Sequence, residues 1–176
     1  MAKIEAGKFV LNVETVELDG IIQECAAMIR HRCSARSFEI QVSGQKNISL
    51  TADRKALRQI LLNLLSNAAK FCSDKGRVEI RIGVLEGQVL LEVRDDGVGI
   101  AARDLARLGQ PFEQVTQDST LARGGTGLGL ALVYALAEKH GGNVRIASQL
   151  GEGTAVCVSL PRAAAHAAPL YKCATA

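Results

Sequence analysis

Residues 124–130 read Gly-Gly-Thr-Gly-Leu-Gly-Leu and run directly into the apolar stretch 131–138. Glycine has no Cβ, so its backbone can adopt positive φ and approach another group closely. A glycine-rich turn that opens a helix presents backbone N–H groups and the positive end of the helix dipole, which together attract phosphate. The stretch therefore predicts a phosphate-binding turn at the start of a helix, and a flexible loop before a packed helix is the alternative.

The strongest helical pattern lies upstream and begins at Asp53. Apolar residues recur every three or four positions and predict a face buried in a core, formed by Leu57, Ile60, Leu61, Leu64, Leu65 and Ala68. A polar stripe runs beside this face, formed by Gln59, Asn63, Asn67 and Lys70. Because Asn is a mediocre helix former, the stripe indicates either residues that line a site or the polar border of an ordinary helix.

A second candidate site follows a predicted hairpin. Residues 78–82 and 89–93 alternate between apolar and polar, which is typical of strands, and a turn-like stretch separates them. The second strand runs into Asp95-Asp96-Gly97-Val98-Gly99-Ile100. A carboxylate at a strand end can accept a hydrogen bond from a ligand while glycines let the backbone close over it. A calcium loop would need more oxygen ligands at closer spacing than this stretch supplies.

The rest of the chain mixes strands and helices. Alternation predicts a strand at 8–16, a hairpin of 38–42 and 48–50, and two final strands around 151–154. Helical spacing predicts helices that follow Asp19, span 101–108, and run from about 127 to the glycines at 141–142. The long stretch 109–125 shows no periodicity, which is typical of a lid or a binding loop. This order is not the regular alternation of a doubly wound sheet.

Composition limits the classes of function. The chain has 176 residues and a formal net charge of +3, with 3% aromatic residues. This length suits one domain, and interspersed charges without stacking aromatics argue against binding of nucleic acid. The five cysteines lack metal-ligand spacing and are typical of reduced thiols in a cytoplasmic setting. We expect a cytoplasmic segment without membrane contact, in a parent chain whose own anchoring stays open.

Three separated motifs resemble the ATP-binding domain of sensor histidine kinases, a branch of the GHKL ATPase superfamily. They are Asn63-x-x-x-Asn67-x-x-Lys70, Asp95-x-Gly97-x-Gly99 and the stretch 125–130, which that family calls the N, G1 and G2 boxes. Residues 111–114, Pro-Phe-Glu-Gln, resemble the F box, although many members carry a further Phe near Leu108. The resemblance covers about residues 8–161. It implies that 1–7 end a preceding dimerisation helix or linker. Residues 162–176 are rich in Ala and have no amphipathic pattern, so we expect a disordered tail there.

The resemblance implies an α/β two-layer sandwich, in which a mixed, mainly antiparallel sheet of about five strands packs on three helices beside an ATP lid. It implies a site for Mg-ATP where Asp95 accepts a hydrogen bond from the adenine amino group, Asn67 is the protein ligand of Mg²⁺, and Lys70 holds the phosphates. The residues implied in catalysis are Asn63, Asn67 and Lys70. Those implied to contact the nucleotide also include Phe71, Asp95, Gly97, Gly99, Ile100, Arg123, Gly125, Thr126, Gly127, Leu128, Gly129 and Thr154.

Asn63 bears on the kind of reaction. In hydrolysing relatives such as gyrase and Hsp90, a Glu at this place activates water, and an amide cannot act as a general base at neutral pH. We therefore expect slow hydrolysis and transfer of the γ-phosphoryl group to an acceptor. The kinase family phosphorylates a His on a preceding dimerisation domain, and His31, His140 and His166 all lack the sequence context of that acceptor.

The resemblance thus predicts a protein-histidine kinase catalytic domain of two-component signal transduction. Its expected partners are the His-containing dimerisation domain of the parent kinase and a response regulator. The parent is expected to be a homodimer and the isolated domain a monomer. The alternatives are an ATP-binding regulatory or pseudokinase module in a phosphorelay, and a serine kinase of the anti-sigma type or a GHKL ATPase. Asn63 disfavours the ATPase, while the Phe112 box and residues 139–142 favour the histidine kinase branch.

Overall fold

A five-stranded sheet forms one layer of the protein. The structure, a computed structural model, describes residues 10–34, 37–105, 108 and 127–163. The sheet has the order β2 (Phe38–Gly44), β4 (Gly76–Leu85), β5 (Gln88–Asp95), β7 (Gly153–Pro161) and β6 (Asn143–Gln149). β2 and β4 are parallel, and the other neighbouring pairs are antiparallel. The prediction of a mixed, mainly antiparallel sheet is confirmed.

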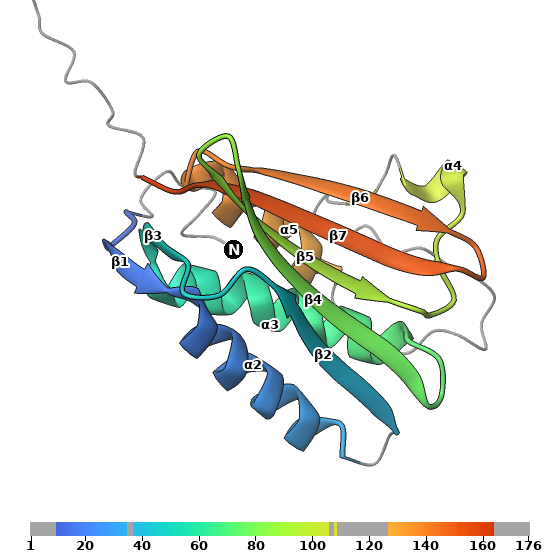
Figure 1. The fold of residues 1–176 in the computed structure, drawn as a ribbon. Coiled ribbons are helices and arrows are strands. Elements are labelled where there is room, and N and C mark those ends of the chain that lie inside the picture. Colours follow the sequence, from blue (N-terminus) through green and yellow to red (C-terminus); the bar gives the residue numbers. More distant parts are fainter. Residues whose placement is uncertain (1–9, 35–36, 106–107, 109–126, 164–176) are drawn as a thin grey trace, which may run out of the picture.

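Three helices form the second layer and cover one face of the sheet (Figure 1). They are α2 (Leu18–Arg32), α3 (Arg54–Phe71) and α5 (Leu128–Lys139), with α3 in the middle. The helix predicted over 101–108 is represented by the short α4 (Ala102–Leu105). The predicted ATP lid, residues 109–125, lies outside the described residues. No helix in the described ranges is long and apolar enough to cross a bilayer.

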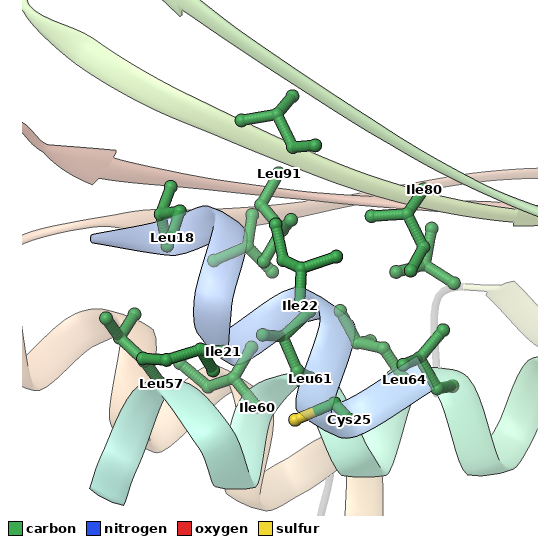
Figure 2. Packing of buried hydrophobic residues seen from close by; sticks show 14 of the residues in the cluster. Leu18, Ile21, Ile22, Cys25, Leu57, Ile60, Leu61, Leu64, Ile80 and Leu91 are labelled. Atoms are coloured by element: carbon green, nitrogen blue, oxygen red, sulfur yellow. The ribbon is translucent and has the colours of Figure 1, made fainter. Parts of the chain in front are cut away.

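The core lies between α2, α3 and the sheet (Figure 2). All six apolar positions predicted for the face of α3 are buried in one core cluster. Figure 2 shows Leu57, Ile60, Leu61 and Leu64 facing the α2 residues Leu18, Ile21, Ile22 and Cys25. Side chains alternate across a strand, so Ile80 of β4 and Leu91 of β5 point from the sheet into the same core. Burying one such Leu or Ile contributes about 2–3 kcal/mol, which fixes the position of α3 against the sheet.

The predicted hairpin of 38–42 with 48–50 is wrong. β2 pairs in parallel with β4, whereas β3 (Ser49–Asp53) pairs with β1 (Val13–Glu17) in a separate two-stranded sheet. The chain continues along β4 after β2, because the Gln45 N–H donates to the Ile82 carbonyl at 2.9 Å and the Gln45 side chain accepts the Val84 N–H at 2.7 Å. These contacts hold the connection against β4, so it cannot fold back as a tight turn.

Arg162 joins the small sheet to the large one. Its N–H donates to the Gly87 carbonyl at 2.9 Å in the β4–β5 turn, and its carbonyl accepts the Thr51 N–H of β3 at 2.9 Å. Its Nε also donates to the Ser49 carbonyl at 3.3 Å. The first residue of the predicted tail therefore makes hydrogen bonds to the folded body.

The ends of α3 and α5 that lie far from the glycine-rich stretch are tied together. The Asp53 carboxylate caps α3 by accepting the N–H groups of Lys55 and Ala56 at 2.9 and 3.0 Å, and it also accepts the Asn12 N–H at 2.9 Å. The Asp53 N–H donates to Nε2 of His140, the residue that ends α5, at 3.1 Å. Nδ1 of His140 lies 2.7 Å from the Leu136 carbonyl, so the contacts fit a neutral ring protonated on Nδ1.

Candidate functional site

The polar stripe of α3 faces the start of α5. Gly127, at φ 69°, is the N-cap of α5 and has no side chain of its own that could cap the helix. A methyl group at Gly129 would lie 3.7 Å from Asn63 Oδ1 and 4.0 Å from Asn67 Nδ2. The structure thus brings two predicted site residues of α3 against the first turn of the helix that the glycine-rich stretch opens.

The amide of Asn63 carries an unused donor at this contact. Its Oδ1 accepts a hydrogen bond from Gln59 Nε2 at 3.4 Å, but its Nδ2 is buried and, within the described ranges, has no hydrogen-bond partner. A buried polar group without a partner costs about 1–3 kcal/mol. Because buried polar atoms are almost always paired, this donor fits a ligand that offers an oxygen acceptor.

Lys70 and Phe71 lie at the end of α3. The Lys70 Nζ lies 4.6 Å from the centroid of the Phe71 ring, within the range of a cation–π contact. The Phe71 side chain is 38% exposed, so one part of its ring surface is open to a ligand or to solvent. The Phe71 carbonyl accepts the Val98 N–H at 3.3 Å, which links the end of α3 to the loop that follows β5.

Asp95 forms the second part of the site. It ends β5 and is 7% exposed, and its Oδ1 accepts the Gly97 N–H at 2.9 Å. Burial raises the pKa of Asp95 to about 6, although hydrogen bonds from the N–H groups of Gly97 and Thr154 act in the opposite direction. A buried carboxylate of this kind can accept a further hydrogen bond from a ligand. Such a bond favours the ionised form of the carboxyl group.

The neighbouring Asp96 has a different task. Its carboxylate accepts the N–H groups of Arg77 at 2.8 Å and Ser73 at 3.4 Å, and its backbone carbonyl accepts the Ser73 hydroxyl at 2.8 Å. These bonds hold the connection between α3 and β4. The two consecutive carboxylates therefore differ in their contacts. Asp95 is buried in the protein, whereas Asp96 accepts backbone N–H groups at the connection between α3 and β4.

The two glycines of the loop that comprises residues 95–100 meet protein backbone. A Cβ on Gly97 would collide with the Phe71 carbonyl, and one on Gly99, at φ 66°, would collide with the Gln149 carbonyl. The loop is also held by the Val98 carbonyl, which accepts the Gly151 N–H at 2.8 Å. Close packing against α3 and the β6–β7 turn thus requires glycine at both positions.

Ser148 holds the far end of this loop, and no motif in the sequence pointed to this residue. Its Oγ accepts the Ile100 N–H at 2.8 Å and lies 2.9 Å from Thr154 Oγ1. It also donates to the Gly153 carbonyl at 2.7 Å. The alternation of β6 and its pairing with β7 would have placed Ser148 beside Thr154, so the signal lay in the strand register and not in a motif.

Three of the predicted site residues cannot be placed. Arg123, Gly125 and Thr126 lie outside the described residues, as does Phe112 of the predicted F box. The described residues nevertheless bring Asn63, Asn67 and Gly129 into one group. Asp95, Gly97 and Gly99 lie in a loop held against the end of the same helix.

Comparison with known proteins agrees with this geometry. Residues 52–164 match the family described as histidine kinase-, DNA gyrase B-, and HSP90-like ATPase. An uncharacterized sensor-like histidine kinase of Rhizobium meliloti (strain 1021) is 44% identical over 96% of this chain and 32% of its own length. Histidine protein kinase DivJ of Caulobacter vibrioides is 41% identical over 92% of this chain and 27% of its own length. The chain thus spans about a third or less of these relatives.

Solved structures show the same fold. The crystal structure of full-length ShkA in complex with AMPPNP superposes with a TM-score of 0.80 and 32% identity, over 93% of this chain and 34% of that one. The mycobacterial sensor histidine kinase MprB gives a TM-score of 0.71 and 30% identity, over 85% of this chain and 97% of that one. The chain therefore belongs to the histidine kinase-, DNA gyrase B-, and HSP90-like ATPase family, and these relatives place it with the catalytic domains of histidine kinases.

Proposed function

We propose that this domain binds Mg-ATP and donates the γ-phosphoryl group to a histidine on a separate dimerisation domain in two-component signal transduction. The observation that carries the proposal is the buried Nδ2 of Asn63, which has no hydrogen-bond partner among the described residues and lies on α3 against the first turn of α5. A helix start attracts phosphate, and an orphaned amide donor beside it suits a phosphate oxygen. The AMPPNP complex of ShkA supports the same assignment, because AMPPNP is an analogue of ATP.

The base would lie at Asp95. The buried carboxylate would accept the amino N–H of adenine, whereas guanine would present a carbonyl there and be repelled. Phe71 and Ile100 would flank the base, and Thr154 would help to hold Asp95 through its backbone N–H. Gly97 and Gly99 would keep the loop close enough for the base to reach Asp95.

The phosphates would lie between α3 and α5. The residues from Gly125 to Gly129 would supply backbone N–H groups, and Lys70 would supply a positive charge, with Arg123 as a further candidate. Asn67 fits a role as a Mg²⁺ ligand, because Mg²⁺ takes few protein ligands and completes its shell with phosphate oxygens and water. When bound, Mg²⁺ would neutralise phosphate charge.

The transfer itself would need an acceptor on another domain. The bond between the γ-phosphorus and its bridging oxygen would break, ADP would leave, and a new bond would form to an imidazole nitrogen of the acceptor. Asn63 cannot take a proton from water at neutral pH, so this chain alone would hydrolyse ATP slowly. A response regulator would then receive the phosphoryl group, and the parent would be a homodimer.

The direct test mixes this domain with a separately produced His-containing dimerisation domain and ATP labelled on the γ-phosphate. Label is expected on the His domain with the wild-type chain and not with Asn67→Ala or Asp95→Asn. ATP binding without transfer would instead support the regulatory alternative. Absence of nucleotide binding would refute the assignment altogether.

A calorimetric titration examines the metal separately. Omitting Mg²⁺ is expected to weaken ATP binding to the wild-type chain, and the Asn67→Ala variant is expected to lose most of that difference. An Asn67→Ala variant with the full Mg²⁺ dependence would remove Asn67 from the role of ligand.

A further inference from the structure

The loop of residues 95–100 is attached at both ends. At its start, the Asp95 side chain accepts the Gly97 N–H, so the orientation of the carboxylate depends on the path of the loop. At its end, the Ile100 N–H is received by the Ser148 hydroxyl. The middle is held by backbone atoms of Phe71 and Gly151. The Ser148 bond is thus a side-chain anchor that a substitution can remove without touching Asp95.

Ser148 lies in register with the base-reading carboxylate. Asp95 of β5 pairs with Thr154 of β7, and Thr154 pairs with Ser148 of β6. Side chains of directly opposed residues lie on the same face of a sheet, so Asp95, Thr154 and Ser148 form one row on the face that the helices cover. The row ends at the strand on which the loop is anchored.

The hydroxyl of Ser148 is fully used. A serine offers one donor and two acceptor positions. The donor goes to the Gly153 carbonyl at 2.7 Å, one acceptor position takes the Ile100 N–H at 2.8 Å, and the other is open to the Thr154 hydroxyl at 2.9 Å. Alanine at this position would leave the Ile100 N–H and the Gly153 carbonyl without these partners.

We propose that Ser148 is a positioning residue for recognition of the adenine base, because its hydroxyl anchors the loop that orients the Asp95 carboxylate. The proposal rests on the proposed function, in which Asp95 reads the amino group of adenine. Ser148 itself touches no substrate in this assignment. Substitution of Ser148 is therefore expected to change the discrimination between bases and to leave the binding of the phosphates unchanged.

The test compares binding of ATP and inosine triphosphate (ITP), which carries a carbonyl where adenine carries its amino group, to the full chain with Mg²⁺. Ser148→Ala is expected to weaken ATP binding about tenfold, as for one lost hydrogen bond and an unpaired N–H, and to change ITP binding less than about twofold. Ser148→Thr keeps the hydroxyl and is expected to restore the preference for ATP. Ser159→Ala is the matched control, because the Ser159 hydroxyl donates to the Asn143 carbonyl at the opposite end of the same two strands.

The outcomes separate this inference from the proposed function. Unchanged ATP binding by Ser148→Ala, or an equal loss for ATP and ITP, overturns the role of Ser148 and leaves the proposed function standing. A wild-type chain that binds ATP and ITP equally overturns the reading of adenine by Asp95, and the inference with it. A wild-type chain that binds neither overturns both. Thermal unfolding checks each variant, and Ser148→Cys replaces the alanine variant if that variant does not fold.

Discussion

In the proposed function, Asp95 combines the role of acceptor for adenine with an energetic cost to the fold. Its carboxyl group is buried at the end of β5, and its pKa is raised to about 6 because burial disfavours the charged form. An ionised carboxylate is the form that can accept a donor from adenine. The same residue should therefore control both the pH dependence of nucleotide binding and part of the pH dependence of stability.

Nucleotide affinity is expected to fall as the pH drops below about 6. The pKa of Asp95 in the free protein is about 6, so at lower pH a proton must leave Asp95 before the base can bind. By linkage, the affinity should fall about tenfold for each pH unit well below that value. Calorimetry of ATP binding between pH 5 and pH 8 measures this profile. Asp95→Asn should bind more weakly with a flat profile, and a wild-type profile that is flat as well would contradict the role of Asp95.

Without nucleotide, Asp95→Asn is expected to stabilise the fold at pH 8. A carboxyl pKa raised by folding means that the folded state holds its proton more tightly, so the contribution of Asp95 to stability is lost as the pH rises from about 4 through about 6. A neutral amide avoids this cost, with an expected gain of about 1–3 kcal/mol. Urea unfolding at pH 8 and pH 4 tests the difference, which should shrink at the lower pH.

Gly97→Ala is expected to distort the loop and abolish nucleotide binding. The new methyl group would collide with the Phe71 carbonyl, and a backbone atom at the end of a packed helix cannot easily move. We expect a loss of about 2–4 kcal/mol in unfolding free energy, as for overpacking against a rigid neighbour. Gly83→Ala is the matched control, because a methyl group there would have no atom within 4 Å. Equal stability of the two variants would contradict this account.

At the scale of elements, α3 and α5 form a pair that is joined at both ends. Asn63 and Asn67 meet Gly129 at one end, and Asp53 meets His140 at the other. The Asp53 carboxylate also accepts the N–H of Asn12, just ahead of β1. Asp53, which connects the two helices, therefore also holds the residue just ahead of β1.

His140→Ala is expected to loosen this helix pair. The substitution removes the acceptor of the Asp53 N–H, with an expected loss of about 1–3 kcal/mol. Arg54→Ala, one residue beyond Asp53, removes an exposed ion pair with Glu24 and should cost less than about 1 kcal/mol. Denaturant unfolding compares the two variants. A His140→Ala variant no less stable than Arg54→Ala would show that the tie contributes little.

At this scale, the elements that depend on residues close in the sequence were predicted correctly, and the contacts between residues far apart in the sequence were not. The apolar repeat of α3, its start at Asp53 and the β4–β5 hairpin depend on near neighbours, and each prediction is confirmed. The pairing of β2 with β4 joins residues that are far apart in the sequence, and the predicted local hairpin was wrong. His140 and Ser148 were missed as partners of Asp53 and Ile100 because separations of 87 and 48 residues leave no periodic signal.

At the scale of the whole molecule, the motifs pointed to residues of the candidate site more than to the contacts that support it. They singled out Asn63 and Asn67, which lie on α3 against the first turn of α5, and Asp95, which ends β5. They did not predict the second sheet, because its strands pair across the length of α2. Neither did they predict that Arg162 fastens this small sheet to the β4–β5 turn, since single hydrogen bonds to backbone carbonyls require no particular residue type.

This last connection predicts that Arg162 contributes to the stability of the fold. Two shortened chains, one ending after Pro161 and one after Ala163, differ by two residues, of which Arg162 makes three hydrogen bonds to Gly87, Thr51 and Ser49. The shorter chain should leave the Thr51 N–H and the Gly87 carbonyl without these partners, and it should lose about 1–3 kcal/mol in unfolding free energy relative to the longer one. Arg162→Ala in the longer chain keeps both backbone bonds and should cost less than half of that difference. Equal unfolding midpoints for the two shortened chains would show that the Arg162 bonds do not stabilise the fold and that the small sheet is held by the core alone.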